Sequence, residues 1–246
     1  MSDEMTPDVS AADPAAKPAK SAGAHLGERE REGVIDLLGV IAYGSISGFT
    51  RMAADSEMAS DMHLKTALAG MAVKEFTNYE LLVSHIVELG GDPWEAMTPF
   101  KEAFDAYHAR TKPRDVLEGL VKAYIGDGIA NDFFREIARY VDDESREIIE
   151  QASGDDGRTE VIVGAVRDAI HKERTLAGPL ALWGRRLVGE ALSQGQLVAV
   201  ERDALSELIL GTSHDRPGAG LEEIGQIMTR LTDAHQKRMG ALGLIA

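Results

Sequence analysis

The amino-acid sequence predicts an all-α protein, built as an up-and-down four-helix bundle with additional helices towards the C-terminus. Apolar residues recur at intervals of three and four from about Leu26 to the end of the chain, which is the period of an amphipathic helix. The composition is 44% apolar but only 5% aromatic, and it is rich in alanine and unbranched side chains, which favour helices over strands. No segment shows the two-residue alternation of a strand.

The N-terminal residues 1–25 differ from the rest of the chain. They hold three of the eight prolines and few large apolar side chains, so they cannot bury enough surface to offset the entropy of ordering. We predict a disordered tail over 1–25 and a single helical domain over 26–246.

The first two helices are expected at about 28–56 and 60–89. Gly90 and Gly91 end the second helix, as the left-handed conformation of a C-terminal glycine would. The apolar stripe of the first helix runs through Val34, Leu37, Leu38, Ile41, Ser45, Phe49 and Met52. That of the second runs through Leu64, Leu68, Met71, Glu75, Asn78, Leu82, Ile86 and Leu89.

Five further elements complete the expected fold. After a short helix at 99–109, Pro113 is expected to open a third long helix, where a missing N–H costs nothing. A fourth element starts near Glu144 and is interrupted at 154–157. The chain then continues as a long helix and a last helix, which are expected at 175–210 and 221–242.

Charge and residue usage exclude several classes of function. The formal net charge of −15 keeps the chain soluble and repels phosphate backbones, so nucleic-acid binding is disfavoured. There is no cysteine, which excludes disulfides and thiolate metal ligands. No apolar run approaches the roughly 20 residues that span a bilayer, and no secretory signal is evident, so we expect no membrane partner and a cytoplasmic location.

Polar residues stand where core residues are expected. Five of them fall in phase with the buried stripes of successive helices: Ser45, Glu75, Asn78, Asp127 and Asp155. Carboxylates that converge in a core need a cation or a proton. Bundles that hold two metal ions use this arrangement, with a Glu from each of two helices and Glu-x-x-His from each of the other two.

Four segments carry a resemblance to a known family. They are AYGSISGF at 42–49, KEFTNYELL at 74–82, LVKAYIGDGIANDFFREIARYVDDE at 120–144 and LALWGRRLVGEALSQGQLVAVERDAL at 180–205. In their order and spacing, the chain resembles the actinobacterial ferritin-like proteins that are grouped with the tRNA-modifying di-iron hydroxylases, the MiaE-like family. The resemblance implies a ferritin-like bundle and, in active members, a non-haem di-iron centre that activates oxygen to hydroxylate a substrate.

The metal ligands of that family are only partly present. The ligand positions hold Ser45, Glu75, Asn78, Asp127, Asp155 and Arg158. Glu75, Asp127 and Asp155 therefore form a vestigial metal site, while both histidines and one carboxylate are replaced. Asn is a weak neutral donor and Arg a permanent cation, so neither substitutes for imidazole. We expect no catalytic residue and no cofactor, with Arg158 neutralising the remaining acids.

The predicted function is therefore a non-catalytic role, in which the protein binds an unknown protein or small molecule. The alternative is a working di-iron hydroxylase with bound iron. A third interpretation is a structural protein that forms a homodimer through the helices at 175–210 and 221–242.

Several polar residues also have simpler interpretations. Glu75 and Asp127 could be solvated acids at the edge of a stripe, and Asp155 could belong to a turn. His85 and Glu88 are expected to form one solvated pair.

Overall fold

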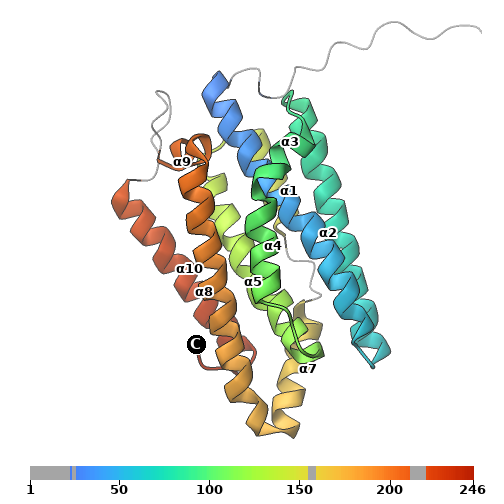
Figure 1. The fold of residues 1–246 in the computed structure, drawn as a ribbon. Helices are drawn as coiled ribbons and strands as arrows, with labels where there is room; N and C mark the ends of the chain where they lie inside the picture. Colours follow the sequence, from blue (N-terminus) through green and yellow to red (C-terminus); the bar gives the residue numbers. More distant parts are fainter. Residues whose placement is uncertain (1–22, 24–25, 155–158, 211–219) are drawn as a thin grey trace, which may run out of the picture.

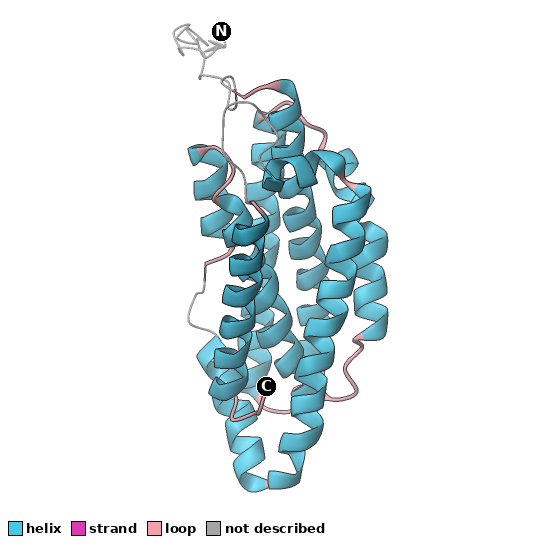
Figure 2. Ribbon diagram, turned by 90° about the vertical axis from the view of Figure 1, so that its left-hand side faces the viewer, coloured by secondary structure: helices cyan, strands magenta, loops and turns pink. Residues whose placement is uncertain are grey.

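The protein is a long bundle of helices that run nearly parallel to one axis (Figures 1 and 2). The computed structural model describes residues 23, 26–154, 159–210 and 220–246, and these residues contain no strand. The bundle consists of α1 (Glu28–Glu57), α2 (Met62–Glu88), α5 (Val116–Ala138) and a broken fourth helix made of α6 (Asp143–Ala152) and α7 (Thr159–Lys172). The predicted all-α fold and its break after α6 are confirmed, although Asp155 and Arg158 lie outside the described residues.

Shorter helices and two C-terminal helices surround this bundle. They are α3 (Pro93–Met97), the 3-10 turn η1 (Thr98–Phe100), α4 (Lys101–Arg110), the 3-10 turn η2 (Arg174–Leu176), α8 (Ala177–Glu201), α9 (Asp203–Leu210) and α10 (Leu221–Ala241). The helix expected at 175–210 is thus divided at Arg202, whose guanidinium binds the buried Asp36 of α1. This pair fixes the junction of α8 and α9 to the bundle.

Aspartate side chains begin four of the helices. Asp61, Asp92, Asp115 and Asp142 each accept a hydrogen bond from a backbone N–H in the first turn of the helix that follows. Such caps satisfy donors that have no partner within the helix. Pro113 therefore does not open the third long helix as expected, because Asp115 is the cap and α5 begins at Val116. Gly90, with φ of 81°, follows α2 as predicted.

The buried apolar side chains of the bundle form two separate clusters. The first apolar cluster includes Leu37, Leu82, Phe100, Phe134 and Ile149. The second apolar cluster includes Met52, Leu68, Leu120, Ile125 and Leu187. On α1, α2 and α5, the residues between the two clusters are largely polar or small. The apolar core is therefore interrupted at mid-length, where Ser45, Glu75, Asn78 and Asp127 lie.

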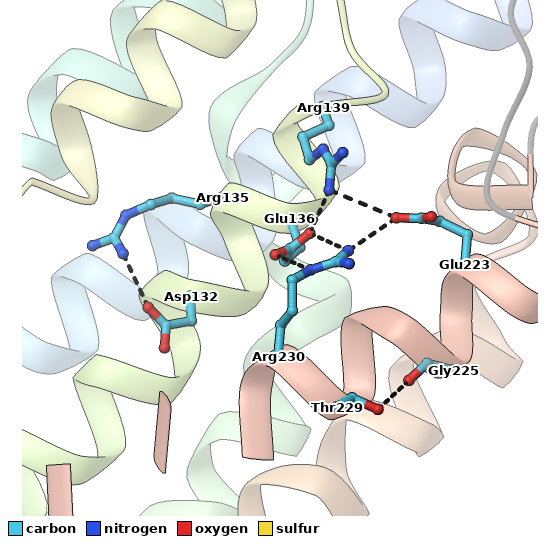
Figure 3. A network of polar contacts seen from close by, with 8 residues as sticks. All are labelled: Asp132, Arg135, Glu136, Arg139, Glu223, Gly225, Thr229 and Arg230. Carbon is cyan, nitrogen blue, oxygen red and sulfur yellow. Dashed lines mark hydrogen bonds and ion pairs between the residues drawn. The ribbon is translucent and has the colours of Figure 1, made fainter. Parts of the chain in front are cut away.

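Charged side chains fasten α10 to α5 along the side of the bundle (Figure 3). Arg230 of α10 binds Glu136 of α5 at 2.8 and 2.9 Å, and it also binds Glu223 at 2.9 Å. Arg238 binds Asp132 at 2.6 Å. We call this set of pairs the α5–α10 ionic seam. A Cβ at Gly128 of α5 would lie 2.3 Å from the Arg238 Nε atom, so a larger residue there would displace the Arg238 side chain.

α1 is apolar enough over part of its length to cross a membrane by composition alone, which differs from the sequence-based expectation. Its mean hydropathy reaches 1.4 over such a window, but 56% of that window is buried inside the bundle. Its apolar face is thus already used in packing against the other helices.

Candidate functional site

A group of ionisable side chains lies in the interior between α1, α2, α4 and α5. We call it the central polar cluster; its members are Asp55, Glu75, Tyr107, His108, Lys122 and Asp127, and the exposed Arg51 lies at its edge. Glu75 lies against Gly48 of α1, where a Cβ would be 3.5 Å from the Glu75 Cγ. That distance is an ordinary van der Waals contact, so Glu75 lies alongside this turn of α1.

Asp127 is the innermost acid of the cluster. Its Oδ2 atom is buried and accepts no hydrogen bond within the described part of the chain. Burial raises the pKa of Asp127 well above its usual value, and the nearby Glu75 and Asp55 raise it further. Lys122 acts in the opposite direction. Glu75 and Asp127, which the sequence placed on facing stripes, therefore do influence each other electrostatically.

Lys122 supplies a cation inside the same cluster. Its side chain is 8% exposed, and its ammonium donates a hydrogen bond of 2.8 Å to the backbone carbonyl of Thr111. The ammonium also lies 5.3 Å from the centre of the Tyr107 ring. Burial lowers the pKa of Lys122 to about 8, against the opposing effect of Asp55 and Asp127. The acids of the cluster thus have a cation of the protein beside them.

α4 adds two buried polar rings to this region. The Tyr107 hydroxyl and the His108 Nδ1 atom are both buried and without a hydrogen-bond partner in the described residues. Burial raises the pKa of the Tyr107 hydroxyl, and Asp127 contributes to that rise. Burial also lowers the pKa of His108 to about 3, with Lys122 and Arg51 adding to the effect. His108 is therefore uncharged at neutral pH.

The residues present do not fit a pair of iron ions. Ser45 and Asn78 are buried, at 6% and 5% exposure, and offer only neutral oxygen donors at two positions where the resemblance leads us to expect metal ligands. The Lys122 ammonium is a third unfavourable feature, because a cation of the protein repels a metal cation. Within the described residues, three His, Asp or Glu ligand atoms converge within 4.8 Å at His85, Glu88 and Glu144, and not in the central polar cluster.

Sequence reasoning missed Lys122, Tyr107 and His108. Lys122 does carry a signal, since it stands alone inside the apolar run Leu120–Ile125. Tyr107 and His108 carry none, because their role depends on how α4 packs across α1 and α5. The expected solvated pair of His85 and Glu88 is half right. The two side chains do interact at 3.1 Å, but His85 is only 1% exposed.

An antiparallel bundle of long helices with carboxylates at mid-length defines a ferritin-like helical protein. Residues 28–212 match the family described as the ferritin-like domain of actinomycetes, and the chain belongs to this family. No curated protein matches the chain. The match ends before α10, so this helix and its side of the α5–α10 ionic seam lie outside the matched residues.

Proposed function

We propose that this protein is a non-catalytic relative of the tRNA-modifying di-iron hydroxylases and that it acts by binding. In this proposal, the family's metal site has become a cluster of acids that the protein neutralises itself. The observation that carries the proposal is the Lys122 ammonium, buried beside Asp55 and Asp127. The sequence predicts Arg158 as the cation that neutralises these acids, but Arg158 lies outside the described residues. In this proposal, Lys122 supplies the neutralising charge instead.

The argument rests on charge. Two ferrous ions would bring four positive charges into the interior, and a ferritin-like site balances them with four carboxylates and two imidazoles. Of the described ligand positions, only Glu75 and Asp127 are acidic here. Asp127 is also readily protonated, since its pKa is raised by burial and by Glu75. A protonated acid next to an ammonium has little affinity for iron.

The binding role is supported by an open groove on the outer side of α2. The groove encloses about 440 Å³ and is lined by Gly70, Val73, Lys74, Thr77, Asn78, Leu81 and Gln151. Asn78 also stands at one of the lost ligand positions, so the groove and the interior of the bundle share this residue. Apolar side chains, a hydroxyl, an amide and one ammonium suit a small molecule with an apolar body and an acidic group.

Iron uptake tests the proposal. The full chain is incubated without oxygen with two equivalents of Fe(II), exposed to air and desalted; bound iron and the absorption of an oxo-bridged centre are then measured. We expect no oxo-bridge band in the wild type. A variant with Ser45→Glu, Asn78→His, Arg158→His and Lys122→Met should take up iron with that band, because it restores ligands and removes the buried cation.

A matched pair of variants shows whether any bound iron lies in the central polar cluster. Glu75→Gln removes an acid of the central polar cluster, and Glu80→Gln removes an exposed acid of the same helix. Two irons per wild-type chain, with an oxo-bridge band that Glu75→Gln abolishes and Glu80→Gln leaves intact, would overturn the proposal. That result would establish the alternative, a working di-iron hydroxylase.

A further inference from the structure

A second group of metal-ligand side chains lies away from the bundle centre, where the C-terminal end of α2 meets the start of α6. It consists of His85 and Glu88 of α2 and Glu144 of α6. One ligand atom from each of the three lies within 4.8 Å of the other two. His85 is buried and both glutamates are exposed, so the group opens to solvent on one side.

The His85 ring is held in a fixed orientation. Its Nε2 atom is 3.0 Å from the buried Ser145 hydroxyl, and its Nδ1 atom is 3.1 Å from the Glu88 carboxylate. If Nδ1 binds a metal, Nε2 carries the proton and donates it to the Ser145 oxygen. Metal-binding histidines are generally oriented in this way, by a hydrogen bond from the second ring nitrogen.

The charges around this group favour a cation. Within the part of the chain that the structure describes, neither Glu88 nor Glu144 forms an ion pair with lysine or arginine. Asp142, which caps the N–H of Ser145, is 1% exposed and has a buried Oδ2 atom with no hydrogen-bond partner among the described residues. The carbonyl end of α2 adds partial negative charge. Two carboxylates therefore lie beside the His85 imidazole without an ion pair to lysine or arginine in the described residues. Arg31 donates a hydrogen bond of 3.4 Å to the Leu89 carbonyl, so this cation binds the end of α2 and not the two glutamates.

We propose that His85, Glu88 and Glu144 bind one divalent transition-metal ion of the zinc class, which links the end of α2 to the start of α6. One imidazole and two carboxylates are a ligand set that zinc accepts, with a water in the fourth position. Ligand atoms around tetrahedral zinc lie about 3.3 Å apart. Because both glutamates are exposed, small changes of side-chain rotamer bring their oxygens to this spacing. Magnesium and calcium are disfavoured, since they prefer oxygen ligands alone.

Calorimetric titration of the full, tag-free chain with zinc chloride tests the proposal. We expect saturable binding of one zinc per chain that a tenfold excess of magnesium does not displace. Glu144→Gln should weaken binding more than tenfold, and Ser145→Ala about 10- to 100-fold, as for other groups that orient a metal-binding histidine. Cobalt added in place of zinc should give the visible absorption of a four- or five-coordinate site.

Control variants separate this site from others. Glu80→Gln, an exposed charge change on α2, and Glu75→Gln, in the central polar cluster, should bind zinc as the wild type does. Because Glu75→Gln alters the central polar cluster and not the group at His85, its zinc titration tests this inference separately from the proposed function. His85 is buried, so His85→Gln is used only if its circular dichroism and urea midpoint match the wild type. The inference is overturned by the absence of one-to-one binding, or by equal binding in Glu144→Gln and the wild type.

Discussion

The two acidic groups of this bundle differ in what surrounds them. The central polar cluster lies between four helices and contains the buried ammonium of Lys122. The group at His85 is open on one side, and Glu88 and Glu144 have no lysine or arginine partner within the described residues. The first resembles a metal site by the position of its acids in the fold. The second resembles one by its chemistry.

This difference shows that location in a fold does not define a metal site. A carboxylate in the middle of a ferritin-like bundle binds metal only if the neighbouring groups leave negative charge for the metal to neutralise. Lys122 and the raised pKa of Asp127 remove that charge at the centre. Four predictions test this contrast, from the largest expected effect to the smallest.

Lys122→Met should destabilise the protein at pH 7 by about 3 kcal/mol, the upper end of the cost of leaving buried polar groups without a partner, because Asp55 and Asp127 lose the nearby ammonium. It also leaves the buried carbonyl of Thr111 without its donor. The deficit should shrink at pH 5, because protonation of Asp55 and Asp127 removes the unpaired charge. Urea unfolding at both pH values measures this effect. Adding Asp127→Asn should restore part of the lost stability; a double variant no more stable than Lys122→Met would contradict the account.

His108→Gln should protect the protein against acid. The pKa of His108 is lowered to about 3 in the folded chain, so its contribution to stability is complete above pH 6.5 and decreases as the pH falls towards 3. At pH 4.5, two units below the ordinary histidine pKa of 6.5, the loss amounts to about 3 kcal/mol, since one pKa unit corresponds to about 1.4 kcal/mol. The measurement is the change in unfolding free energy between pH 7 and 4.5. The exposed His171 provides the control, and His171→Gln should change nothing.

Asp127→Asn should stabilise the protein at alkaline pH. The pKa of Asp127 is raised in the folded state, so its contribution is complete below about pH 4 and is lost as the pH rises through the folded value. Asparagine does not ionise, so we expect the variant to be more stable than the wild type at pH 9. Thermal unfolding between pH 6 and 9 should show a flatter profile for the variant. An unchanged slope would mean that Asp127 is not the group that titrates.

Glu144→Gln should leave the stability of metal-free protein within about 0.5 kcal/mol of the wild type, as expected for an exposed side chain without a buried partner. Zinc should then raise the melting temperature of the wild type and not that of the variant, because an ion that binds only the folded state stabilises it. A large loss of stability without metal would show that Glu144 has a structural role instead.

The helices could be predicted well from the sequence because their signals are local. The stripes of α1 and α2, the glycine after α2 and the break after α6 all follow from residues within a few positions of each other. Two helix boundaries were predicted wrongly. Asp115, rather than Pro113, caps α5, and the ion pair of Arg202 with Asp36 divides the predicted helix at 175–210. That pair joins residues far apart in the sequence, so a local pattern does not reveal it.

The candidate sites could be predicted only in part. The phase of a stripe places Ser45, Asn78 and Asp127 towards the interior, but it does not show where a long side chain ends. Lys122 lies off the stripe, and its flexible chain carries the ammonium into the interior. The partner of His85 is Ser145, which is 60 residues away and is brought close only by the packing of α6 on α2.

The last helix, α10, is attached to the bundle in different ways at its two ends. Its first turns carry few buried apolar residues and attach to α5 through Arg230 and Glu136, with Glu223 alongside. At its other end, α10 places the fully buried Met239 in the second apolar cluster. Added salt should therefore weaken the attachment of the start of this helix more than that of its end.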